Sequence, residues 1–130
     1  MAQTFAQKLN LKPGQALALV NPPQGMAALL AGLLPDNPLI DRVNSQTEAA
    51  LVFLTKRAEA DLLPGIYARL QPGGLAWAAY PKGGSQVPTD LNRDILWKLV
   101  EPAGWRPVRM VALDETWSAM RFRREEGSGS

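Results

Sequence analysis

Short, uninterrupted apolar runs alternate along this chain with longer segments that repeat apolar residues at helical spacing. The runs at 16–20, 49–54 and 75–80 have the length of strands that are covered on both faces. Segments 26–33 and 56–70 carry apolar residues three or four positions apart, which is typical of helices with one buried face. Buried strands that alternate with amphipathic helices predict a parallel α/β sheet.

Proline and glycine positions set the expected ends of these elements. Pro22 and Pro23 suit the first turn of a helix, where a missing N–H costs nothing. Residues 39–40 follow a proline and form a very short strand, which we expect at a sheet edge. Pro64 lies inside segment 56–70 and predicts a kink, or two short helices of which Pro64 begins the second. The helix after Pro23 should bury one stripe, formed by Met26, Leu29, Leu30 and Leu33.

The remaining elements are read in the same way. Residues 4–10 predict a short leading helix, and Thr89 or Asp90 is expected to cap a helix that reaches Val100. Strands at 108–113 and 117–122 should form a hairpin. The expected order is β-α-β-β-α-β-α-β-β.

This order predicts an α/β fold, a three-layer, doubly wound, mostly parallel sheet of about six strands with an antiparallel last strand. Residues 1–126 are expected to form a single domain, a length that suits one hydrophobic core. Residues 127–130, Gly-Ser-Gly-Ser, have the composition of a flexible tail or of an added linker and are left out of that domain.

Composition removes several classes of chemistry. The chain has no cysteine and no histidine, which excludes zinc sites built on those residues and serine–histidine catalysis, so we predict no metal ligands and no catalytic residue. The net charge of +2 is a weak field and does not favour a nucleic-acid partner, although arginines gather near the end of the chain. No apolar run is long enough to span a bilayer and no signal-peptide core begins the chain, so we expect a cytoplasmic protein without membrane contact.

Three short motifs carry a resemblance to known families. They are Tyr80-Pro81-Lys82, Thr89-Asp90-Leu91 and the stretch 114–122, which reads Asp-Glu-Thr-Trp-Ser-Ala-Met-Arg-Phe. With them, the chain resembles an uncharacterised bacterial family known as domain of unknown function 3052. The path from Leu51 to Phe122, with its Pro-Gly-Gly turn at 72–74, also resembles the second half of a class I methyltransferase domain. The resemblance implies a minimal methyltransferase-like Rossmann fold and supplies no activity.

The turn after the first strand departs from true methyltransferases. Their glycine-rich turn lets the backbone approach the cofactor, whereas here it reads Asn21-Pro22-Pro23-Gln24-Gly25. We therefore expect proline to occupy the space that an adenosyl cofactor needs, and we predict no cofactor. Asn21-Pro22-Pro23 also resembles the Asn-Pro-Pro-aromatic motif of adenine amino-methyltransferases, but Gln24 replaces the aromatic residue.

Ligands of open α/β sheets bind beyond the carboxyl ends of the strands, which directs attention to the polar residues there. Asp41 follows the second strand, where cofactor-binding sheets place an acid for ribose hydroxyls, although a solvated surface acid is the simpler interpretation. The loop with Lys82, Ser85 and Thr89 could hold a phosphate or carboxylate at the start of the next helix, although Asp90 would oppose an anion. The residues expected at this edge are Asn21, Asp41, Thr55, Tyr80, Lys82 and Asp114.

The final hairpin supplies the second group of candidates, Asp114, Glu115, Trp117 and Arg121. Strand alternation points Arg121 into a layer beside core side chains, where an arginine needs a carboxylate partner or a ligand anion. We favour Asp114 or Glu115 as that partner. Paired acids can also do acid–base work when burial raises one pKa.

These observations favour a non-catalytic binding or protein-interaction module. It would bind an unknown protein partner or a small anionic ligand, and a homodimer is compatible with the sequence. The alternative is a small enzyme, or a nucleotide- or S-adenosylmethionine-binding protein, that uses the Lys82 loop and the Asp114–Arg121 hairpin.

Overall fold

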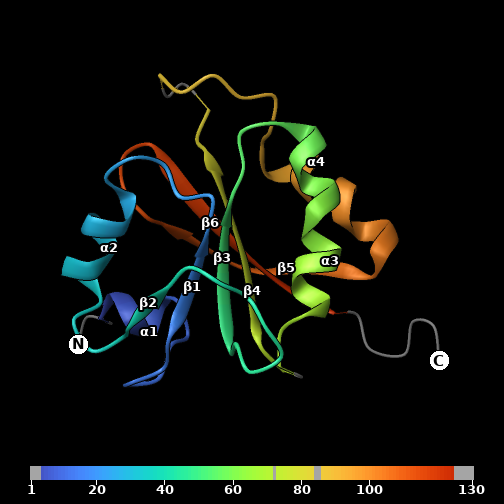
Figure 1. The fold of residues 1–130 in the computed structure, drawn as a ribbon. Coiled ribbons are helices and arrows are strands. Elements are labelled where there is room, and N and C mark those ends of the chain that lie inside the picture. The colour runs from blue at the N-terminus through green and yellow to red at the C-terminus, as the bar shows by residue number, and fades with distance from the viewer. Residues whose placement is uncertain (1–3, 72, 84–85, 125–130) are drawn as a thin grey trace.

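The computed structural model describes residues 4–71, 73–83 and 86–124. Its strands are β1 (Leu17–Val20), β2 (Leu39–Ile40), β3 (Ala49–Phe53), β4 (Leu75–Pro81), β5 (Trp105–Ala112) and β6 (Trp117–Arg124). They form one six-stranded sheet in the order β2-β1-β3-β4-β6-β5 (Figure 1). The first four strands run parallel, and β6 is antiparallel to both of its neighbours.

Helices cover both faces of this sheet and complete three layers. The α-helices are α1 (Phe5–Lys8), α2 (Met26–Leu33), α3 (Leu63–Ala68) and α4 (Arg93–Val100), and two 3₁₀ segments, Arg57–Leu62 and Glu101–Ala103, adjoin α3 and α4. Figure 1 shows α1 and α2 on one side of the strands and α3 and α4 on the other. The α/β fold, the six-stranded sheet and the antiparallel β6 are confirmed.

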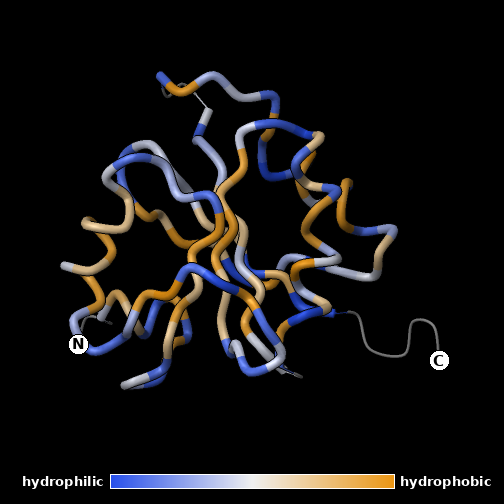
Figure 2. Tube along the Cα trace, in the orientation of Figure 1, coloured by the Kyte–Doolittle hydropathy of each residue, from blue (hydrophilic) through white to orange (hydrophobic). Residues whose placement is uncertain are grey.

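The core consists of two apolar layers, one on each face of the central strands. All five residues of β3 are buried, and orange, apolar segments follow the inner strands in Figure 2. On the α1 and α2 side, Trp77 is completely buried and its indole Nε1 donates a hydrogen bond to the Leu9 carbonyl at 3.2 Å. On the α3 and α4 side, Tyr67 packs beside Phe122. Burial on both faces explains why the inner strands are continuous apolar runs.

Two details of the proline interpretation are confirmed. β2 is the edge strand of the sheet and pairs only through Leu39 and Ile40. Pro64 lies in the first turn of α3, directly after the 3₁₀ segment, so of the two predicted alternatives, a kink or two short helices, the second is confirmed. Proline is accepted there because the first N–H groups of a helix have no partner within the helix.

Two helix predictions are wrong. In α2, Met26 and Leu30 are buried, but Leu29 and Leu33 are each 38% exposed, so the stripe is narrower than its periodicity implied. The helix α4 is not capped by Thr89 or Asp90. It begins after Asn92, whose side-chain oxygen accepts a hydrogen bond from Ile95 N at 2.8 Å. The asparagine cap satisfies one N–H at the helix start, and it places the start of α4 two residues later than a cap at Asp90 would.

The strand β5 forms the other edge of the sheet and is irregular. Its pairing with β6 shifts between Pro107 and Arg109. Val108 and Met110 are exposed, at 41% and 43%. Proline removes a backbone donor from the strand, which is tolerated at an edge and not in the interior of a sheet.

The strand order places a topological switch beside β1. The chain moves from β1 outward to β2 and then crosses to β3 on the opposite side of β1. The connections therefore leave the carboxyl ends of β1 and β3 in opposite directions, the position at which open α/β sheets hold ligands. None of the helices in the described part of the chain is both long and apolar enough to cross a membrane.

Candidate functional site

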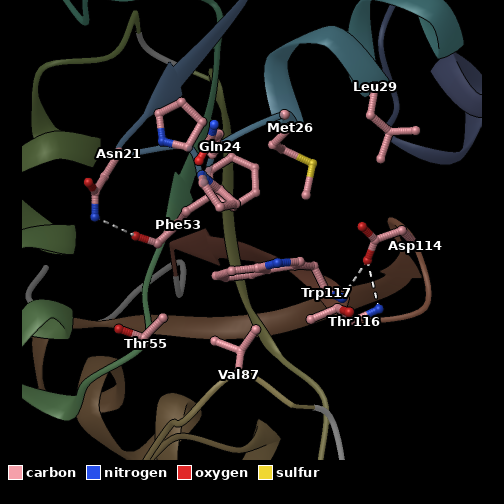
Figure 3. Close-up of a pocket in the computed structure, with 13 residues that line it drawn as sticks. Asn21, Gln24, Met26, Leu29, Phe53, Thr55, Val87, Asp114, Thr116 and Trp117 are labelled. Atoms are coloured by element: carbon pink, nitrogen blue, oxygen red, sulfur yellow. Dashed lines mark hydrogen bonds between the residues drawn. The ribbon is translucent and has the colours of Figure 1, made fainter.

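A cleft lies at the switch point, beyond the carboxyl ends of β1 and β3 (Figure 3). Its volume is about 570 Å³, which is within the range of small-molecule sites. Three segments meet there: the turn 21–25 after β1, the end of β3 with Phe53 and Thr55, and the β5–β6 hairpin. A cleft therefore lies at the edge of the sheet where the sequence predicted a site.

The turn after β1 forms one wall of the cleft. Asn21 adopts a left-handed backbone conformation with φ of 57°, and Gly25 follows with φ of 84°. The Asn21 amide Nδ2 donates to the Phe53 carbonyl at 3.4 Å and joins the ends of β1 and β3. Pro22 and Pro23 line the cleft. The prolines thus border the cleft, and the expectation that they exclude an adenosyl cofactor stays a prediction.

The apolar side of the cleft is formed by aromatic and aliphatic residues. Phe53 and Trp117 meet edge to face, with ring centroids 5.5 Å apart and an interplanar angle of 77°. Both rings are mostly buried, and Met26 and Leu29 from α2 extend this surface. Figure 3 shows the Trp117 ring below the Met26 side chain. A ligand that entered the cleft would meet a preformed apolar surface.

Asp114 supplies the charge of the cleft. Among the described residues that line it, Asp114 is the only one with an acidic or basic side chain. Its Oδ1 accepts hydrogen bonds from the backbone N–H of Thr116 at 2.8 Å and of Trp117 at 2.6 Å. The Asp114 carbonyl accepts a hydrogen bond from Lys82 Nζ at 2.7 Å. Asp114 therefore holds the hairpin turn in place and makes the cleft acidic.

The loop after β4 is tied to the end of β3 and not to a helix start. Thr89 Oγ1 donates to the Thr55 carbonyl at 2.7 Å. Asp90 Oδ1 accepts a hydrogen bond from Arg57 N at 2.8 Å. Because α4 begins later, the anion site that the sequence suggested here lacks its helix end, and Lys82 is bonded to the hairpin instead. Ser85 lies outside the described residues.

The structure separates the other predicted edge residues. Asn21, Thr55, Asp114 and Trp117 meet in the cleft. Asp41 does not; its exposed side chain lies 3.9 Å from Arg42 and borders a different cavity, beside β2. Tyr80 belongs to the layer on the α4 side, where its hydroxyl lies 4.0 Å from Met110 Sδ and burial raises the pKa of its phenol.

The predicted pairing of Arg121 with Asp114 or Glu115 is wrong. Arg121 Nη1 donates to Asn10 Oδ1 at 3.1 Å. Asp114 is engaged by its own turn, and Glu115 is exposed. Arg121 pairs across the sheet with Trp77, whereas Trp117 pairs with Pro81, so four strand residues, about 13 Å, separate Arg121 from the start of β6. Arg121 therefore lies near the start of β4, at the end of the sheet away from the cleft.

Sequence reasoning missed part of the cleft. Phe53 is the last residue of a predicted strand, so strand position could have found it. Met26 and Leu29 were assigned to the core, and Val87 belongs to a loop without a motif.

Among the described residues, no three acidic side chains come close enough together to hold a metal ion.

The strand order and the switch-point cleft define a Rossmann-like α/β fold of the methyltransferase type. No family model matches the chain, and no curated protein matches it in sequence. Solved structures do. The pyocyanin biosynthetic protein PhzM superposes with a TM-score of 0.58 and 14% identity over 93% of this chain and 54% of PhzM. The chain therefore spans about half the length of that protein.

Two further structures share the fold. The ribosomal protein L11 methylase from Lactobacillus delbrueckii subsp. bulgaricus matches with a TM-score of 0.57 and 12% identity, over 92% of this chain and 76% of the methylase. DhpI in its SAH complex matches with a TM-score of 0.54 and 11% identity, over 94% of this chain and 72% of DhpI. At such identities the likeness concerns the fold alone.

Proposed function

We propose that this protein binds a ligand of the S-adenosylmethionine class in the cleft between the β1 turn and the β5–β6 hairpin. The observation that carries the proposal is the position of the cleft, which lies at the topological switch point of the sheet. A second support is the fold shared with the L11 methylase and with DhpI, whose structure is a complex with SAH (S-adenosylhomocysteine).

The chemistry of the cleft agrees with such a ligand better than with an anion. Asp114 gives the cleft a negative charge, and the face or edge of Trp117 can contact a ring or a cation. S-adenosylmethionine offers an aromatic ring system, polar hydroxyls and a positively charged sulfonium. None of the described residues that line this cleft is cationic, so the small anionic ligand that the sequence suggested would meet no charged partner in its wall.

The proposal covers binding and not methyl transfer. Acid–base catalysis needs a side chain that can exchange a proton with the substrate. Asp114 is the only acid among the described residues of the cleft, and its Oδ1 already accepts two backbone hydrogen bonds. Substrate and reaction therefore do not follow from this site.

A second candidate function is the interaction module favoured by the sequence. Its specific support is α2, where Leu29 and Leu33 are each 38% exposed on a helix beside the cleft. Apolar side chains at helical spacing on a surface can pack against another protein. In that case the cleft would be the border of a protein contact and would not discriminate among small ligands.

The test is calorimetric titration with S-adenosylmethionine, S-adenosylhomocysteine, adenosine and ATP, supported by thermal shift. Ligand at a hundred times its dissociation constant stabilises a protein by about 2.7 kcal/mol, which is a shift of several degrees for a domain of this size. The variant Gln24→Trp places a large ring at the exposed turn of the cleft. The matched control Gln46→Trp makes the same change at an exposed residue away from it.

Saturable binding of an adenosyl ligand that Gln24→Trp weakens at least tenfold, with Gln46→Trp unchanged, is the expected result. ATP should bind more weakly than the adenosyl ligands, because its phosphates meet the charge of Asp114. If neither adenosyl ligand binds at millimolar concentration, the proposal is wrong and the interaction module becomes the better account.

A further inference from the structure

The Asp114 carboxylate lines the cleft with only one of its two oxygens engaged. Its Oδ1 accepts the backbone hydrogen bonds from Thr116 and Trp117, at 2.8 and 2.6 Å. Neither a hydrogen bond nor an ion pair joins its other oxygen, Oδ2, to a described residue. Figure 3 shows this second oxygen turned away from the two N–H groups and toward the side where Leu29 of α2 lies. One oxygen therefore fixes the carboxylate, and the other is available to a ligand.

No cation in the wall of the cleft neutralises this carboxylate. The described residues that line the cleft include neither lysine nor arginine. The ammonium of Lys82 is bonded to the Asp114 carbonyl, and the ion pairs within the described part of the chain, Asp41–Arg42 and Arg93–Asp94, do not include Asp114. A carboxylate without a counter-charge attracts a cationic group of a ligand that comes within a few ångströms.

The aromatic wall beside Asp114 strengthens this attraction. Trp117 supplies one of the two N–H groups that hold Oδ1, and its ring packs edge to face on Phe53, which also lines the cleft. An apolar wall excludes water from one side of the charge, so the charge is screened less than it would be on an open surface. A sulfonium carries its charge on a sulfur surrounded by carbon groups, which can contact an aromatic surface.

The start of α2 acts in the opposite sense. Gly25 and Met26, where α2 begins, also line the cleft. The N-terminus of a helix favours an anion, such as the α-carboxylate of an amino acid. S-adenosylmethionine and S-adenosylhomocysteine carry the same α-carboxylate and the same α-ammonium, so this effect is common to both. The two ligands differ only in one methyl group and in the positive charge on sulfur.

From these observations, we propose that Asp114 makes the cleft selective for the sulfonium form of its ligand, because Oδ2 pairs with the positively charged sulfur. Asp114 is then a specificity-determining residue, and the cleft holds the charged methyl donor in preference to its demethylated product. This inference rests on the proposed function and names the ligand within it. One such charge contact, in a cleft that is open to water on one side, corresponds to a preference of about tenfold.

The experiment is a calorimetric titration of the full chain with S-adenosylmethionine and with S-adenosylhomocysteine at low ionic strength. The measured quantity is the ratio of their two dissociation constants, which should favour S-adenosylmethionine by about tenfold. Added salt should reduce this ratio, because screening weakens the charge contact that only one of the ligands makes. The salt series uses the unaltered protein and so does not depend on the folding of any variant.

Two variants assign the preference to Asp114. Asp114→Asn keeps an oxygen acceptor for the turn and removes the charge. It should weaken S-adenosylmethionine by about tenfold, leave S-adenosylhomocysteine nearly unchanged and bring the ratio close to one. Glu115→Gln is the matched control, since it removes the same charge from an exposed side chain of the same turn that does not line the cleft, and it should keep the parent ratio. The comparison separates the charge from the packing of the extra methyl group, which Asp114→Asn leaves in place.

The proposal is overturned if the parent binds both ligands equally, if salt leaves the ratio unchanged, or if the preference survives in Asp114→Asn, which would assign it to the methyl group. It is also overturned if Asp114→Asn weakens both ligands equally, because the carboxylate would then hold the α-ammonium that they share. In all these cases the adenosyl ligands still bind, so the proposed function stands. If the parent binds neither ligand, the proposed function and this inference are both wrong.

Discussion

Replacing Asp114 by alanine should destabilise the protein far more than the same change at its neighbour Glu115. Asp114 Oδ1 accepts two backbone hydrogen bonds, at 2.8 and 2.6 Å, that close the turn between β5 and β6. Glu115 is exposed in the same turn. Both variants remove one negative charge, so they have the same effect on net charge and differ in what the carboxylate holds.

The size of the effect follows from those two contacts. A hydrogen bond to a charged group contributes about 1.5–3 kcal/mol, and the lower value applies because Asp114 is half-buried and open to water. Asp114→Ala should therefore cost about 3 kcal/mol, against a typical total stability of about 5–15 kcal/mol. Asp114→Asn keeps an oxygen acceptor without its charge and should cost about half as much. Glu115→Ala should stay within about 0.5 kcal/mol of the parent.

Urea unfolding followed by far-ultraviolet circular dichroism measures these differences. With a slope of about 2 kcal/mol per molar urea, Asp114→Ala should lower the midpoint by about 1.5 M. The melting temperature should fall by about 10 °C. Equal midpoints for Asp114→Ala and Glu115→Ala would show that the Asp114 carboxylate does not hold the turn. The claim that this carboxylate fixes the hairpin wall of the cleft would then be wrong.

Three further outcomes are expected. Trp77→Phe should cost about 3 kcal/mol, because it removes a buried hydrogen bond and about two carbons of packing, whereas Trp97→Phe, 39% exposed, should cost under about 0.5 kcal/mol in the same urea assay. Gly74→Ala should clearly lower the melting temperature, because the new Cβ would lie 2.9 Å from the Gln71 carbonyl oxygen and 3.2 Å from that of Glu48. Gly83→Ala is the control, since its Cβ would meet open space, and thermal unfolding compares the two variants. Burial raises the folded-state pKa of Tyr67, so its contribution to stability is complete below about pH 10 and is lost as pH rises further. An alkaline absorbance titration should show one phenol that ionises only when the protein unfolds. If both tyrosines of the chain ionise while the protein is still folded, this reasoning is wrong.

Most of the fold could be predicted from local patterns. The run at 49–54 is continuous and apolar because β3 is buried on both faces, and this signal needs no knowledge of its neighbours. Pro64 marked a helix boundary because the restriction on its backbone is local. The stripe on α2 was predicted too wide because periodicity shows which residues share a face, and not how much of that face the sheet covers.

The site was harder to predict because its contacts are not local. The cleft position follows from strand order, and Asn21 and Asp114 were found through it. The partner of Arg121 was missed because it depends on how β6 lies against α1, which brings Asn10 to the guanidinium. The contact between Tyr67 and Trp105 had no sequence signal, since the two rings meet only when α3 packs on the hairpin.

The irregular edge strand has a consequence for how copies of this protein meet. An unpaired strand normally offers its backbone to other chains, which leads to intermolecular ribbons and aggregation. Here Pro107 removes one donor, the shifted register beside it disturbs the spacing of the others, and Arg106 and Arg109 would face like charges in an antiparallel copy. Association at high concentration is therefore expected to proceed through side-chain surfaces, with the sheet itself ending at six strands.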